Sequence, residues 1–317
     1  MNLALSTVRE AQSLLSGFLP RTRLVPAQSL SREGTNVFLK LESELPTGSF
    51  KPRGALYALA VNLKRGRVKG VLASSTGNHG AAVAYAAERL GVSATIFLPE
   101  NPNPVKRERI SSLGASIFEG GRDIRDAFHR ASAYATAEGL YFLNDATDPD
   151  LPAGPAAIAC EILDEIPETG AIYVPMGDTA LIRGIASAAK QISRAIRIIG
   201  VQAERAPAYY LSWQQGRVVE TQTCDTIADG LATRTPESEN VESIRELVDD
   251  VRVVTEDQMI SAIRHLWFAE HLLAEPSGAA TTAAMLHHDG PLPAKVVLIL
   301  SGANIAPDVR RCALDAG

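Results

Sequence analysis

The stretch NVFLKLESELPTGSFKPRGALYALAVNLKRG, residues 36–66, combines a short apolar run, a polar turn and a long run of helix-forming residues. It predicts a strand over residues 36–42 and a helix over 51–63, joined through the turn at Gly48 and Ser49. Lys51 then lies at the start of the helix. Near the positive end of a helix dipole, and desolvated, its amine should lose part of its preference for the ammonium form. The stretch therefore predicts a nucleophilic lysine; the alternative is an ordinary solvated one.

The same alternation of apolar runs and helix-forming segments continues along the chain. Strands that are apolar along their whole length are typical of parallel sheets covered by helices on both faces, so we predict an open α/β fold. The loop at 144–155, rich in Asp, Pro and Gly, is the clearest domain boundary. The further predicted strands are 70–74, 93–99, 115–120, 140–144, 171–175, 196–203 and 294–300. The further predicted helices are 78–90, 104–113, 122–138, one ending near 194, and two around 260 and 279.

The composition excludes several classes of protein. A chain of 317 residues, 46% hydrophobic and 21% charged, is long enough for two folded domains. The net charge of -5 is spread along the chain without a basic stripe, so we expect no nucleic-acid partner. No run of about 18 apolar residues predicts a membrane span. The three cysteines, Cys160, Cys224 and Cys312, match neither a disulfide framework nor a zinc spacing, and we expect a cytoplasmic protein.

Polar loops follow several of the predicted strands, where open α/β sheets bind ligands. In ASSTGNHGAAVAYAA, residues 73–87, the N–H groups of a helix start and the side chains of Ser75, Thr76 and Asn78 suit a carboxylate. Simple capping of the helix is the alternative. His79 alone indicates a structural rather than a catalytic residue.

A second polar loop, VPMGDTALIRGIASAAK at 174–190, places the turn Gly177-Asp178-Thr179-Ala180 before a helix and suits a phosphate. It matches neither a Walker loop nor a dinucleotide fingerprint. A third, VVLILSGANIAP at 296–307, brings Ser301 to a strand end. Together with a nucleophilic lysine and a carboxylate loop, these features indicate a phosphorylated aldehyde held as a Schiff base, which is pyridoxal 5'-phosphate.

The whole chain resembles the fold-type II pyridoxal-phosphate enzymes, specifically the serine/threonine dehydratase and serine racemase group. The resemblance implies a tryptophan synthase β-like fold of two open, twisted α/β domains with the cofactor between them. Residues 1–47 and 149–317 would form the large cofactor-binding domain, and 48–148 the smaller one with the asparagine loop. It also implies a homodimer. The matching motifs are KLESELPTGSFKPRGA (40–55), SSTGNHGAAVAYAA (74–87), TIADGLATRTP (226–236), AEPSGAA (274–280) and LSGANI (300–305).

The resemblance also implies roles for individual residues. Lys51 would hold the cofactor and take the substrate Cα proton, with Phe50 packed beside the ring. Asn78 would bond the ring hydroxyl, and Ser301 would face the pyridine nitrogen. The residues expected to bind the carboxylate of a small amino-acid substrate are Ser75, Thr76, Gly77, Asn78 and His79. The residues expected to bind the phosphate are Gly177, Asp178, Thr179 and Ala180.

The chain departs from this pattern in three places. Many relatives have a run of glycines where Asp178 stands. A carboxylate about 4 Å from a phosphate is repelled by roughly 1 kcal/mol in water, so we expect this side chain to turn away and cap the following helix. Some relatives bind a divalent cation, but Tyr210 stands near Glu204 where a carboxylate would be expected, and we predict no metal. Thr76 stands where a serine is common.

The predicted function is elimination of water, or another β-substituent, and ammonia from a small β-hydroxy L-amino acid. Racemisation needs a second acid–base group on the face opposite Lys51, and the methyl group of Thr76 would crowd that position. A racemase or a threonine synthase-like lyase is the alternative enzyme. A non-catalytic protein that binds the cofactor is the alternative from another class.

Overall fold

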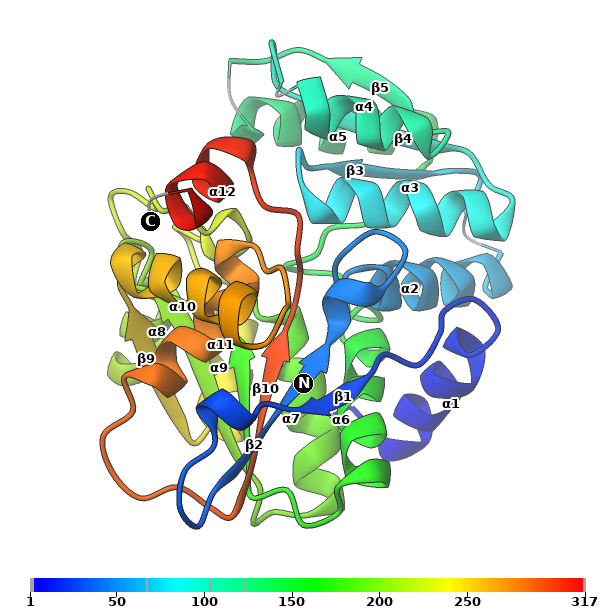
Figure 1. Cartoon of the computed structure of the whole chain (residues 1–317). Helices are drawn as coiled ribbons and strands as arrows, with labels where there is room; N and C mark the ends of the chain where they lie inside the picture. The colour runs from blue at the N-terminus through cyan, green and yellow to red at the C-terminus, as the bar shows by residue number, and fades with distance from the viewer. Residues whose placement is uncertain (1–2, 67, 103, 123, 316–317) are drawn as a thin grey trace.

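The computed structural model describes residues 3–66, 68–102, 104–122 and 124–315, and its strands form two sheets. Figure 1 shows the smaller sheet at the top of the molecule and the larger one below it. The larger sheet has the order β1 (Leu24–Pro26), β2 (Asn36–Leu41), β10 (Lys295–Leu300), β7 (Ala171–Pro175), β8 (Arg197–Ala203) and β9 (Asp250–Val254). The smaller sheet has the order β5 (Ser116–Glu119), β4 (Ala94–Leu98), β3 (Val71–Ser74) and β6 (Tyr141–Phe142).

The pairing within both sheets is parallel, apart from β1, which runs antiparallel to β2 at the edge of the larger sheet. The open α/β fold predicted from apolar strands is therefore confirmed. The central strands β7 and β10 are buried almost throughout, which is why they lack polar alternation. β10, the last strand in the described residues, lies between β2 and β7. The predicted division into residues 1–47 with 149–317, and 48–148, places the larger sheet in the first part and the smaller sheet in the second. The division itself stays a prediction.

The helices cover the faces of the two sheets (Figure 1). Their bounds are α1 (Leu5–Leu15), α2 (Pro52–Lys64), α3 (Asn78–Leu90), α4 (Pro104–Ser112), α5 (Ile124–Glu138), α6 (Ala153–Glu165), α7 (Ala180–Ile192), α8 (Ala208–Gln215), α9 (Ser238–Leu247), α10 (Glu256–Ala269), α11 (Pro276–Leu286) and α12 (Pro307–Leu314). The prediction for α3 is confirmed at both ends, because Gly91 adopts the left-handed conformation, φ 70°, that terminates a helix. The predicted helix 122–138 includes Asp123, which lies outside the described residues.

One part of the predicted boundary loop is helical. α6 begins at Ala153, inside the stretch 144–155 that the sequence indicated as loop, so that prediction is wrong for its last three residues. The Asp148 carboxylate accepts hydrogen bonds from the backbone N–H groups of Asp150 and Leu151, both at 3.0 Å. These two hydrogen bonds form the turn that leads into α6. Pro155 is tolerated in the first turn of the helix, because the N–H group that it lacks would have no helical partner there.

A buried ionic cluster fixes α2 to β2 and α6. Arg53 donates to Glu42 at 2.7 Å and to Glu161 at 2.6 Å, and Lys40 bonds the same Glu161 at 2.5 Å. The Thr22 hydroxyl also donates to Glu42, at 2.7 Å. All of these side chains are 7% exposed or less, so each charge depends on its partners in place of water.

Replacing Glu161 with Gln should destabilise the protein by about 3–5 kcal/mol, because it leaves Lys40 and Arg53 buried without one counter-charge. The measurement is the free energy of unfolding in denaturant. Asp164→Asn on the same helix is the matched control, since its ion pair with Arg9 is about half exposed and should change stability by less than about 1 kcal/mol. Equal effects of the two substitutions would contradict the importance of the cluster.

Candidate active site

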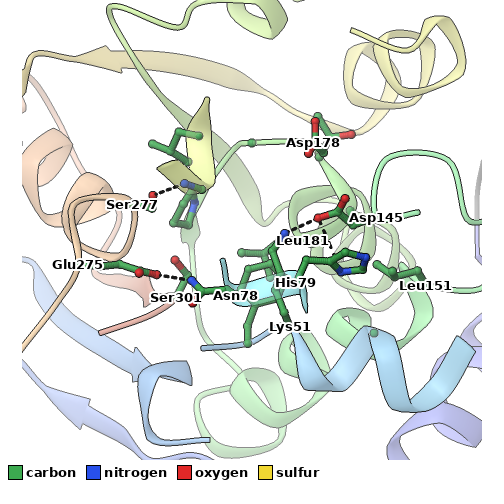
Figure 2. Close-up of a pocket in the computed structure, with 18 residues that line it drawn as sticks. Lys51, Asn78, His79, Asp145, Leu151, Asp178, Leu181, Glu275, Ser277 and Ser301 are labelled. Atoms are coloured by element: carbon green, nitrogen blue, oxygen red, sulfur yellow. Dashed lines mark hydrogen bonds and ion pairs between the residues drawn. The ribbon is translucent and has the colours of Figure 1, made fainter. Parts of the chain in front are cut away.

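A cavity lies where β7 and β10 end and where α2, α3 and α7 begin. It collects residues from seven separate segments of the chain, many of them drawn in Figure 2. The lining residues are Phe50, Lys51, Gly54, Asn78, His79, Asp145, Leu151, Pro175, Gly177, Asp178, Thr179, Ala180, Leu181, Gly230, Leu231, Glu275, Ser277 and Ser301. Strand ends and helix starts meet here, as expected of a ligand site in an open α/β sheet.

Lys51 is held in place by a short bridge between two distant loops. The N–H of Phe50 donates to the carbonyl of Ser301 at 3.0 Å, and the N–H of Ala303 donates to the carbonyl of Gly48, also at 3.0 Å. Gly48 has φ 67°, a left-handed conformation that favours glycine, and a Cβ there would displace the side chain of Asn304. The bridge brings Lys51 and Ser301 to the same cavity.

The charge of Lys51 differs from the sequence-based expectation. Its amine contacts the carboxylate of Asp145, and the same carboxylate oxygen lies 3.8 Å from Nδ1 of His79 (Figure 2). Burial opposes the ammonium form, but Asp145, with smaller contributions from Asp178 and Glu275, outweighs burial and raises the pKa of Lys51. The expectation of a lowered pKa was therefore wrong, because it could not include a carboxylate 94 residues further along the chain.

The asparagine loop lies beside this ion pair. The Asn78 amide donates to Glu275 at 2.8 Å, while its carbonyl oxygen accepts from Asn304 at 2.6 Å. His79 is buried, with Nε2 2.8 Å from the carbonyl of Leu143, and burial lowers its pKa. The bond to a carbonyl requires a proton on Nε2, which leaves Nδ1 facing Asp145. These contacts fix both side chains before any ligand is present.

The preceding residues of the same loop are placed differently. Ser75, Thr76 and Gly77 are partly exposed and are not among the residues that line the cavity. The Ser75 hydroxyl accepts from the N–H of Gly77 at 3.2 Å, in a local turn before α3. Their predicted roles in substrate binding stay predictions.

The turn before α7 is built differently from the expectation for Asp178. Thr179 occupies the cap position with φ 69°, and α7 has no side-chain cap bond, so the prediction that Asp178 caps this helix was wrong. Because Thr179 is left-handed, it turns the chain, and the Asp178 carboxylate instead accepts from the hydroxyl of Thr233 at 2.9 Å. Arg183, one turn into α7, donates to the Thr179 hydroxyl at 3.0 Å.

Asp178 and Asp145 are two carboxylates with opposite electrostatic surroundings. Burial, and next the neighbouring Asp145, raise the pKa of Asp178 to about 6. Burial acts against the charged form of Asp145 as well, but His79 and Lys51 outweigh it and lower the pKa of Asp145. Near neutral pH, Asp145 is the anionic partner of Lys51, and Asp178 is close to the point where it binds a proton.

The donor set fits pyridoxal phosphate. A phosphate would find the amino terminus of α7 and the Thr179 hydroxyl at one end of the cavity, and the Lys51 amine suits the aldehyde. The Ser301 hydroxyl, at the end of β10, suits the pyridine nitrogen. Gly177 can only be glycine, because a Cβ there would lie 2.1 Å from the carbonyl oxygen of Gly230, so two loops close tightly around this end.

Nine of the residues singled out in the sequence line the cavity: Phe50, Lys51, Asn78, His79, Gly177, Asp178, Thr179, Ala180 and Ser301. Sequence reasoning missed Asp145, Glu275 and Ser277. Asp145 belongs to a loop interpreted only as a domain boundary. Glu275 and Ser277 belong to the motif at 274–280, which carried the resemblance without an assigned role.

The chain is similar to known proteins over most of its length. Residues 15–302 match the family described as pyridoxal-phosphate dependent enzyme. The chain is 36% identical over 305 residues to an L-threonine ammonia-lyase of Geobacter sulfurreducens, covering 96% of this chain and 76% of the relative. It is 34% identical over 311 residues to a catabolic L-threonine dehydratase of Staphylococcus aureus, covering 96% and 89% of the two chains.

The structure is also similar to that of maize serine racemase, with a TM-score of 0.92 and 29% identity over 97% of this chain and 95% of that one. In the part of the chain that the structure describes, no helix is long and apolar enough to cross a membrane. The family match spans most of the chain. The cavity brings together Lys51, the turn before α7 and Ser301 at the end of β10. This chain belongs to the pyridoxal-phosphate-dependent enzymes of fold type II.

Proposed function

We propose that this enzyme is an ammonia-lyase, or dehydratase, that converts a small β-hydroxy L-amino acid to a 2-oxo acid and ammonia. The observation that carries the proposal is the position of Lys51, whose amine contacts Asp145 in the cavity that the turn before α7 and Ser301 also line. The relatives named as threonine ammonia-lyase and threonine dehydratase support the same reaction.

The bound cofactor would supply an electron-poor ring that stabilises negative charge at Cα when the Cα proton leaves. Thr179 and the N–H groups at the start of α7 would bind its phosphate, and Ser301 would bind its ring nitrogen. A hydroxyl at that position leaves the nitrogen uncharged, which favours early loss of the β-substituent. Phe50 and the cavity walls would exclude water around the reacting atoms.

Lys51 would take the proton from Cα, and Asp145 would stabilise the resulting ammonium. A general base is effective when its charged form has a partner within hydrogen-bond reach, and the contact with Asp145 meets this condition. Nδ1 of His79 lies 3.8 Å from the same carboxylate oxygen. Lys51 and Asp145 would thus hold the transferred proton while the β-substituent leaves.

Racemisation is the second candidate, favoured by the similarity to serine racemase. It would need a proton donor opposite Lys51, and Thr76 is the residue predicted from the sequence for that place. Thr76 is partly exposed and is not among the lining residues of the cavity. Elimination, which needs Lys51 on one face alone, is therefore the better-supported reaction. The homodimer and the cytoplasmic location stay predictions.

Lys51→Ala should prevent covalent attachment of pyridoxal phosphate and abolish turnover while the fold remains intact. The check is reduction with borohydride followed by mass measurement of the intact protein, with far-UV circular dichroism for folding. Lys64→Ala, at the exposed end of the same helix, should keep the covalent cofactor. Cofactor bound covalently to the Lys51 variant would refute the role of this lysine.

With L-serine or L-threonine, the main products should be ammonia and the 2-oxo acid, with little D-isomer. Elimination should outrun reprotonation, because the cavity offers Lys51 as the base on one face. Ammonia release and D-amino-acid formation are followed together in one reaction. Faster formation of the D-isomer would establish racemisation as the main activity. Retention of cofactor absorbance with neither product would indicate a non-catalytic binding protein.

Asp178→Asn should stabilise the protein more at pH 7 than at pH 4. The ordinary Asp pKa is 3.8, and that of Asp178 is about 6. Between these values the folded state holds a proton that the unfolded state releases, so Asp178 lowers stability as pH rises through this window. Denaturant unfolding at both pH values should show the advantage of the variant growing by about 1–3 kcal/mol. The exposed Asp289→Asn is the control; an advantage independent of pH would contradict the prediction.

A further inference from the structure

The charges around the cavity are unequal. Among its described lining residues, Lys51 is the one lysine, no arginine is present, and three carboxylates face it: Asp145, Asp178 and Glu275. The Glu275 carboxylate, on the left of Figure 2, accepts a hydrogen bond from the Asn78 amide. It is also attracted by Arg109. Asp145 and Asp178 lie on the other side of Lys51, so this side of the cavity is the more acidic one.

The two aspartates share a single lysine within the cavity. Asp145 contacts the Lys51 amine, and Lys51 also attracts Asp178, whose hydrogen-bond donor is the neutral hydroxyl of Thr233. Arg183 attracts Asp178 from behind the cavity wall, but its guanidinium is directed to the Thr179 hydroxyl and is not part of the lining. His79 adds positive charge here only when it is protonated, and burial lowers its pKa. When Lys51 bonds covalently to a ligand or gives up its proton, this side gains negative charge.

A bound substrate must place its side chain in this field. If Lys51 takes the Cα proton, Cα lies roughly 3 Å from the amine, and the substituent on Cβ follows two bonds later. That substituent is then no more than about 8 Å from the Asp145 carboxylate, which contacts the same amine, and this is about one screening length in salt solution. In a desolvated cavity, one unit charge on the substrate side chain at this distance from a carboxylate changes the affinity for the substrate by at least about tenfold.

We propose that Asp145 and Asp178 make this enzyme select amino acids whose side chain carries a positive charge at or next to Cβ, and reject those with a negative charge there. This inference rests on the proposed function, because Lys51 positions the substrate. A cofactor phosphate at α7 adds further negative charge and strengthens the same preference. L-2,3-Diaminopropionate is the smallest amino acid of the preferred class, and L-threo-3-hydroxyaspartate belongs to the rejected class.

The reaction of L-2,3-diaminopropionate balances without a further reactant apart from water. The Cα–H bond breaks and its proton goes to Lys51, while the Cβ–N bond breaks and the β-nitrogen leaves as ammonia. The 2-aminoacrylate that is released takes up one water and gives pyruvate and a second ammonia. Two ammonia molecules form for each pyruvate, compared with one from L-serine.

Binding is tested separately from the ease with which the β-substituent leaves. L-2,4-Diaminobutyrate, L-homoserine and L-aspartate carry positive, neutral and negative side chains and have no leaving group at Cβ. Their dissociation constants are measured by titrating the cofactor absorbance of the holoenzyme. The expected order is diaminobutyrate, homoserine, aspartate, with at least about a tenfold weakening at each step.

Asp145→Asn and Asp178→Asn, measured at saturating cofactor, should each reduce the spread of these constants by about tenfold. The surface variant Asp164→Asn should keep the full spread. If the dissociation constants of the wild-type enzyme for the three ligands agree within threefold, the proposal is overturned, even if L-serine is deaminated. A charge-ordered series without deamination of L-serine, L-threonine or L-2,3-diaminopropionate would support the charge preference and overturn the lyase function instead.

Discussion

The buried ionic cluster of Arg53, Glu42, Glu161 and Lys40 is the constraint on which the site depends. Arg53 is two residues from Lys51 on the same chain segment, so the contacts that fix Arg53 also restrict the direction in which Lys51 projects. Desolvated charges tolerate little displacement, because each one loses partners it cannot replace with water. The cluster joins α2, β2 and α6, which hold the lysine against the large sheet.

The fold could be predicted from the sequence because its signals are local. α3 was predicted to the residue from an alanine-rich run and the glycine that ends it, and β7 from five consecutive apolar or Pro residues. The whole of α6 was missed. Asp, Pro and Gly normally indicate a loop, whereas here Asp148 bonds the backbone of the turn that begins the helix. The short edge strand β1 has only three residues and no pattern of its own.

The candidate site could be predicted in its residues but not in its electrostatics. Lys51, Asn78, Thr179 and Ser301 stand in polar turns between strand and helix, which a sequence displays directly. The protonation of Lys51 depends on Asp145, 94 positions away, and on a contact that only the folded chain creates. Asp178 could be noted as an unusual residue, but its hydrogen bond to Thr233 depends on a loop 55 residues further along.

The position of β10 has a consequence for the order in which the protein can form during synthesis. Of the described strands, this one is made after all the others, yet it lies in the middle of the larger sheet, between β2 and β7. Until it leaves the ribosome, β1 and β2 are separated from β7, β8 and β9, and the loop that precedes Lys51 lacks its partner at Ser301. A nascent chain can complete the smaller sheet early, since its strands are close in sequence. The cavity can form only after β10 has been synthesised and has joined the larger sheet.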